Sequence, residues 1–130
     1  MRLLDIVEIT KASPFSPGTD LNREVRSAYA SDLMSDVLCQ DVSQGLLITS
    51  LSNPQTLRTA EMAEIGAILM VGGKQPLPET LRLARELDIP LIGTEFSMFE
   101  VCGRLDRAGL PSCSRCDEKS ELVSCPDCVD

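Results

Sequence analysis

The amino-acid sequence predicts an α/β fold: a three-layer-like, parallel-rich sheet flanked by helices over residues 1–110, followed by a small metal-stapled tail over residues 111–130. Two observations lead to this prediction. From residue 45 onward, short apolar runs alternate with helical patterns. Such alternation requires crossover connections, which are almost always right-handed and place the strands parallel. The last eighteen residues instead carry two Cys-x-x-Cys pairs and few large apolar side chains.

The first third of the chain is less periodic than the rest. Residues 3–9 fit either a short helix or a strand, residues 13–20 indicate a loop rich in Pro, Gly and Ser, and residues 25–30 indicate a strand. A short helix is predicted over residues 32–38. Its N-cap would be Ser31 or Asp32, because both side chains can accept a hydrogen bond from a backbone N–H of the first turn.

The regular part begins with an apolar run at residues 46–49. Asn53 and Pro54 then predict a helix start, because Asn is a good N-cap and the missing N–H of proline costs nothing at the first helical position. We expect this helix to end near Gly66, which tolerates a left-handed conformation. The continuous apolar run at 67–71 predicts a strand covered on both faces.

Two further units follow the glycine pair at 72–73. Pro78 opens a second helix, and residues 89–94 predict a third strand. The last helix is predicted from an apolar stripe of Phe99, Cys102 and Leu105, and Gly109 and Pro111 would end it.

Composition excludes several classes of function. The net charge is −8 and there is no Lys/Arg run, which argues against nucleic-acid binding. No apolar stretch is long enough to span a membrane, and acidic residues interrupt the N-terminal apolar residues, so we expect a cytoplasmic protein. Histidine is absent, which removes the commonest general base. Asp32 and Asp36 lie four apart and could pair on a helix, but we interpret them as solvated and predict no enzyme.

Three segments resemble the DRTGG domain family of bacteria and archaea, whose members occur alone or joined to phosphotransacetylase catalytic domains or CBS pairs. They are residues 29–38, 66–73 and 89–94, and the resemblance spans roughly residues 1–110. The literal Asp-Arg-Thr-Gly-Gly string is missing, and residues 51–53 are Leu-Ser-Asn where stand-alone relatives often carry a Gln-Thr-His-type turn. The resemblance implies a regulatory or accessory module with no reaction of its own.

A ligand site is expected where the parallel strands end, because ligands of open α/β sheets bind outside the carboxyl ends of the strands. Hydroxyls, backbone N–H groups and Lys74 would suit a small polar or phosphorylated ligand. The candidate residues are Ser31, Asp32, Ser35, Asn53, Gly72, Gly73 and Thr94.

The same residues have a purely structural interpretation. Polar side chains that precede helices serve as N-caps, each worth about 1 kcal/mol. The glycine pair lacks the longer spacing of a phosphate-binding loop and fits a simple turn. The residues that capping would explain are Ser31, Asp32, Asn53 and Thr94.

The strongest chemical signal lies in the tail. Two Cys-x-x-Cys turns facing each other make a tetrahedral four-sulfur site, which suits Zn²⁺, although iron, an iron-sulfur cluster and metal-free thiols stay open. The spacer of eight residues between the pairs is shorter than that of most zinc ribbons. Cys39 and Cys102 lie in apolar stretches and are expected to be inert core residues. The predicted ligands are Cys113, Cys116, Cys125 and Cys128.

These observations favour a non-catalytic regulatory, ligand-sensing or adaptor domain with a structural four-cysteine metal site and a protein partner. The alternative is a redox accessory protein whose cysteine site holds iron or an iron-sulfur cluster and serves a metalloenzyme. Only 3% of the residues are aromatic. Small domains with few aromatic residues often gain stability by pairing, which favours a homodimer.

Overall fold

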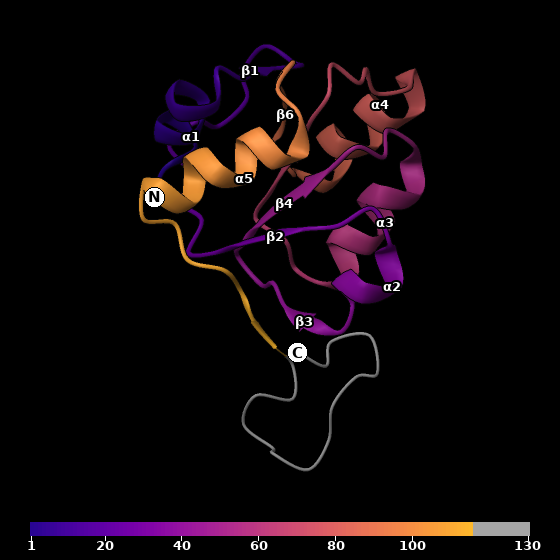
Figure 1. Cartoon of the computed structure of the whole chain (residues 1–130). Helices are drawn as coiled ribbons and strands as arrows, with labels where there is room; N and C mark the ends of the chain where they lie inside the picture. The colour runs from indigo at the N-terminus through magenta and orange to yellow at the C-terminus, as the bar shows by residue number, and fades with distance from the viewer. Residues whose placement is uncertain (116–130) are drawn as a thin grey trace.

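A five-stranded sheet in the order β1-β6-β5-β4-β2 forms the centre of the computed structural model, which describes residues 1–115 (Figure 1). β2, β4, β5 and β6 are parallel, and β1 joins antiparallel to β6. The predicted α/β class and the parallel-rich sheet are therefore confirmed. The strands of this sheet are β1 (Ser13–Pro14), β2 (Ala28–Ala30), β4 (Leu46–Thr49), β5 (Ala67–Met70) and β6 (Leu91–Gly93).

Helices cover both faces of the sheet. One hydrophobic cluster joins α1 and α5 to alternate strand residues such as Leu46 and Ile48. The other joins α2, α3 and α4 to the opposite face of the same strand, which carries Leu47. All four residues of β4 and of β5 are buried, as expected for strands covered on two sides. The helices are α1 (Leu3–Thr10), α2 (Met34–Val37), α3 (Pro54–Met62), α4 (Pro78–Leu87) and α5 (Met98–Arg107).

The N-terminal third differs most from its predictions. Residues 3–9, which fitted either a helix or a strand, form a helix, α1. The expected loop at 13–20 begins with a strand instead, because Ser13 pairs with Gly93 and Pro14 with Ile92. Proline is tolerated there because β1 is an edge strand and needs no ladder donor on its open side. The strand expected over 25–30 is limited to β2, and the helix expected over 32–38 is limited to α2.

The apolar stripe predicted for α5 is wrong at one residue. Val101 and Leu105 are buried, whereas Phe99 is 89% exposed. Val101 and Leu105 are four residues apart and share the face that meets the sheet, and Phe99 does not lie on it. Cys39 and Cys102 are half-buried rather than fully enclosed in the core. No helix within residues 1–115 combines the length and apolarity needed to cross a bilayer.

The start of the predicted tail runs along the edge of the sheet. The N–H of Ala28 donates to the carbonyl of Pro111 at 2.9 Å, and the N–H of Cys113 donates to the carbonyl of Ala28 at 3.0 Å. Beyond this point β7 (Ser114–Arg115) pairs antiparallel with β3 (Gln40–Asp41) in a second, two-stranded sheet. The predicted domain boundary after residue 110 is thus crossed by backbone hydrogen bonds, and the boundary itself stays a prediction.

Candidate functional site

Asp32 joins the carboxyl ends of β2 and β4. Its Oδ1 accepts hydrogen bonds from the Thr49 hydroxyl at 2.8 Å and the Ser50 N–H at 2.7 Å, and its Oδ2 accepts one from the Ser50 hydroxyl. Asp32 is therefore not the N-cap of α2. That position belongs to Leu33, which makes no side-chain cap. Because Asp32 also lies outside the helix, it shares no helical face with Asp36.

The same contacts set the charge of Asp32. Partial burial would raise the pKa of its carboxyl group, but the N–H and hydroxyl of Ser50, the hydroxyl of Thr49 and the positive charge of Lys74 outweigh burial and hold the pKa below its usual range. The group is an anion at neutral pH. Since three donors already occupy its oxygens, it serves as a structural acceptor rather than as an acid or base.

Replacing Asp32 with alanine is expected to lower the free energy of unfolding by about 1–2 kcal/mol at neutral pH, because three donors lose an ionised acceptor. The loss stays this small because Asp32 is exposed, so water can replace part of the interaction. Asp32→Asn keeps one oxygen acceptor and should cost less. The folded-state pKa is lowered, so the contribution is present above the unfolded pKa near 3.8 and is lost as pH falls through the folded value. Urea unfolding between about pH 6 and pH 2.5 measures this loss of stability. If the wild type stayed more stable than Asp32→Asn by the same free energy in acid as at neutral pH, the predicted pH dependence would be contradicted.

The other predicted polar residues also have structural partners. Asn53 caps α3 as predicted, since its Oδ1 accepts from the N–H of Thr56 at 3.3 Å. Thr94 is not a cap. Its buried hydroxyl donates to the carbonyl of Thr10 at 2.7 Å and accepts from the N–H of Phe96 at 3.2 Å, and Ser97 caps α5 instead.

The polar residues that follow β2 differ in their contacts. The Ser31 hydroxyl accepts from the N–H of Leu33 at 3.0 Å within the loop, so it does not cap α2 either. Ser35 is exposed on α2. Asp36 has a buried Oδ1 with no hydrogen-bond partner among the residues that the structure describes.

Gly72 and Gly73 form a left-handed turn, with φ of 72° and 71°. Their N–H groups donate to the carbonyls of Phe96 at 2.7 Å and Thr94 at 2.9 Å, so these amides are not free to hold a phosphate. The turn instead fixes the loop after β5 to the loop after β6. Glycine is favoured at position 73 by this left-handed φ. A Cβ there would lie 2.7 Å from Oε1 of Glu95, but that atom ends an exposed, flexible side chain that can move aside.

A pocket of about 120 Å³ lies where β5 and β6 end. It brings together Gly73 and Thr94 of the predicted site, with Lys74 and Glu95 beside them. Residues from the N-terminal third complete its wall and were missed from the sequence, because only the antiparallel return of β1 carries them here. These added residues are Lys11, Ser13 and Phe15. Ser31, Asp32, Ser35, Asn53 and Gly72 are not among the residues that line it.

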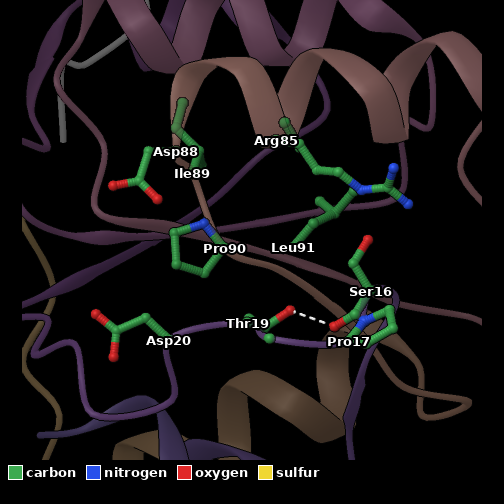
Figure 2. Close-up of a pocket in the computed structure, with 11 residues that line it drawn as sticks. Ser16, Pro17, Thr19, Asp20, Arg85, Asp88, Ile89, Pro90 and Leu91 are labelled. Carbon is green, nitrogen blue, oxygen red and sulfur yellow. Dashed lines mark hydrogen bonds between the residues drawn. The ribbon is translucent and has the colours of Figure 1, made fainter.

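A second pocket, of about 180 Å³, lies at the opposite, amino end of β6 (Figure 2). Figure 2 shows the Arg85 guanidinium at one end and the carboxylates of Asp20 and Asp88 at the other. Arg23 already holds both acids, at 3.2 Å from Asp88 and 3.9 Å from Asp20. None of the predicted site residues lines this pocket. The ion pair between Arg23 and Asp88 links the loop that carries Arg23 to the C-terminal end of α4.

Of the four cysteines predicted to bind a metal ion, the structure describes only Cys113. Cys113 is half-buried against the cluster of α2, α3 and α4, and its Sγ donates to Oε1 of Gln40 at 3.8 Å. Cys116, Cys125 and Cys128 lie outside the described residues. Within residues 1–115, no three His, Cys, Asp or Glu side chains gather closely enough to hold a metal ion. Burial raises the pKa of the Cys102 thiol, which keeps it protonated and unreactive at neutral pH.

The structure is similar to that of the CBS and DRTGG domains of the regulatory region of Clostridium perfringens pyrophosphatase, complexed with the activator diadenosine tetraphosphate. The chain has a DRTGG-like fold. The TM-score is 0.62 with 13% sequence identity, over 94% of this chain and 52% of that one. This chain therefore spans about half the length of that structure. No family model matches the sequence, and no curated protein matches it.

Proposed function

We propose that this chain is a non-catalytic regulatory domain that binds a small anionic, phosphorylated ligand in the pocket at the ends of β5 and β6. The observation that carries this proposal is the convergence of positive charge. The whole chain has three lysines and a net charge of −8, yet two of the three, Lys11 and Lys74, line one pocket. Because the protein as a whole is acidic and repels anions, a pocket lined by two lysines is a favourable place for one.

The size of the pocket limits what it can enclose. Drug-sized ligands occupy pockets of roughly 300–1,000 Å³. A pocket of about 120 Å³ instead suits a single phosphate-sized group, with the remainder of a larger ligand lying outside. Glu95 would repel a second negative charge and accept a hydrogen bond from a hydroxyl of the ligand. The nucleotide activator of the structurally similar regulatory region supports a ligand of this class.

The lysines give the proposal a direct test. Inorganic phosphate, nucleoside phosphates and diadenosine tetraphosphate serve as probes in thermal-shift and calorimetric titrations. Changing both Lys11 and Lys74 to glutamine is expected to weaken binding by about tenfold, as two lost charge-assisted hydrogen bonds at an exposed site would. Lys119→Gln, which changes the only other lysine, is the matched control and should leave affinity unchanged.

Two outcomes would contradict the proposed ligand site. One is a screen in which none of these phosphates raises the melting temperature. The other is an affinity that falls as much in Lys119→Gln as in the double variant, because general loss of positive charge would then explain the effect.

We also propose that Cys113, Cys116, Cys125 and Cys128 bind one metal ion, Zn²⁺, which orders the tail for contact with a protein partner. Four thiolates from two tight turns suit the tetrahedral geometry of zinc. Thiolates also bind iron, so visible absorbance from a purified iron form would favour the redox accessory function instead.

A further inference from the structure

The pocket at the amino end of β6 carries opposite charges at its two ends (Figure 2). The Arg85 guanidinium lies at one end, and the carboxylates of Asp20 and Asp88 lie at the other. Two buried residues of β6 and the turn before it, Pro90 and Leu91, lie between these ends and supply apolar surface. This arrangement is complementary to a small molecule that carries both a negative and a positive charge.

The positive end is available for a ligand. Arg85 lies exposed in the last turn of α4, and within residues 1–115 its side chain forms no hydrogen bond or ion pair. A guanidinium presents a planar pair of N–H donors that matches the two oxygens of a carboxylate. The Ser16 hydroxyl lies on the same side of the pocket and supplies another donor (Figure 2). This end therefore suits a carboxylate.

The negative end keeps a surplus of charge. One guanidinium, that of Arg23, faces both acids: its Nη2 lies 3.2 Å from Oδ2 of Asp88, and its Nε lies 3.9 Å from Oδ2 of Asp20. The Nη1 of Arg23 also donates to the backbone carbonyl of Asp88 at 2.9 Å, which fixes this corner of the pocket. Two carboxylates share one cation there, so a ligand ammonium group, with its three N–H donors, would balance the remaining charge.

The volume of the pocket sets the size of the molecule. It measures about 180 Å³, below the roughly 300–1,000 Å³ of sites for drug-sized ligands. A free amino acid is smaller than such ligands and carries a carboxylate and an ammonium group on the same carbon. Its side chain would contact the apolar surface of Pro90 and Leu91, which favours an aliphatic one.

We propose that this pocket binds a free amino acid with an aliphatic side chain, its carboxylate on Arg85 and its ammonium group beside Asp20 and Asp88. The site shares no lining residue with the proposed phosphate pocket and does not depend on it. The two pockets are nevertheless joined through one segment, because residues 11–15 contribute to the phosphate pocket and residues 16–20 to this one. The domain would thus have separate places for two small ligands.

Probes that lack one charge test the two ends of the pocket separately. L-Leucine carries both charges, L-leucinamide lacks the carboxylate, and N-acetyl-L-leucine lacks the ammonium group. In NMR titrations of the full chain, leucine should bind most tightly of the three. Arg85→Gln should weaken leucine binding about fivefold, as loss of a charge-assisted pair at an exposed site would, and leave leucinamide binding unchanged. Asp20→Asn should weaken binding of leucine but not of N-acetyl-leucine.

Arg82→Gln is the matched control, because Arg82 is an exposed arginine one turn earlier on α4 and does not line the pocket. It removes the same charge and should leave leucine affinity unchanged. Both arginine variants should keep the wild-type melting temperature, so any difference between them reports on the pocket. Equal losses in the two variants, equal wild-type affinity for leucine and leucinamide, or no binding of leucine at millimolar concentration would each overturn the inference.

Discussion

Replacing Gly93 with valine is expected to lower the free energy of unfolding by about 2 kcal/mol, the range found when extra atoms are forced into a packed site. Gly93 is the last residue of β6, and a Cβ there would overlap Cζ of Phe15 and lie 2.7 Å from Cε2 of the same ring. Phe15 is half-buried and packs against the cluster of α2, α3 and α4. The ring would have to move away from the end of β6 and would lose part of its packing. Urea unfolding at neutral pH measures the change.

A matched glycine supplies the control. A Cβ on Gly103, in α5, would meet only the Arg107 guanidinium, at 3.5 Å, so Gly103→Val should change stability by less than about 0.5 kcal/mol. In a double-mutant cycle, Phe15→Ala should relieve much of the cost of Gly93→Val. Equal losses for the two valine variants, or strictly additive losses in the cycle, would contradict a steric role for Gly93.

The regular two-thirds of the fold could be predicted because their signals are local. β4 and β5 read as continuous apolar runs, and their residues are buried on both faces. The Asn53 cap and the prolines at the starts of α3 and α4 place the first residues of those helices correctly. Each of these features depends on neighbours in the chain, which is why periodicity and capping chemistry sufficed. The predicted end of α3 near Gly66 is wrong, because the helix ends at Met62 and the left-handed residue after it is Glu64, with φ of 58°.

The N-terminal third required tertiary information. β1 has two residues, one of them proline, and it is a strand only because β6 lies beside it. Asp32 shows the same limit at the level of one side chain. A carboxylate before a short helix is typical of an N-cap, yet an identical carboxylate can reach across to the next strand, as it does toward Thr49 and Ser50.

Only part of the lining of the pocket at the ends of β5 and β6 could be predicted, for the same reason. Its residues after β5 and β6 follow from the rule that parallel strands end at one edge. Lys11 and Phe15 come from the opposite end of the sequence, and no local pattern places them there. Lys11 ends α1 in a left-handed conformation, φ 56°, and the chain then turns into β1. The convergence of the two lysines became visible only with that antiparallel strand in place.

Replacing Cys116 with serine should abolish stoichiometric zinc binding while the α/β domain keeps its melting temperature. Zinc binding to structural cysteine sites contributes roughly 10–16 kcal/mol of apparent free energy at neutral pH, and a serine hydroxyl cannot replace a thiolate ligand. The domain should be spared because its two hydrophobic clusters are formed within residues 1–113. Elemental analysis of protein purified without added metal measures the loss against the wild type.

Cys102→Ser is the matched control, because it removes a half-buried thiol on α5 and should leave the metal content unchanged. Thiolates must be deprotonated to bind, so acid should release zinc from the wild type, and a strong chelator should do the same at neutral pH. Zinc in the wild type that disappears in Cys116→Ser and persists in Cys102→Ser supports the four-cysteine site. Zinc that persists in Cys116→Ser, or its absence from reduced wild-type protein after zinc is supplied, would refute it.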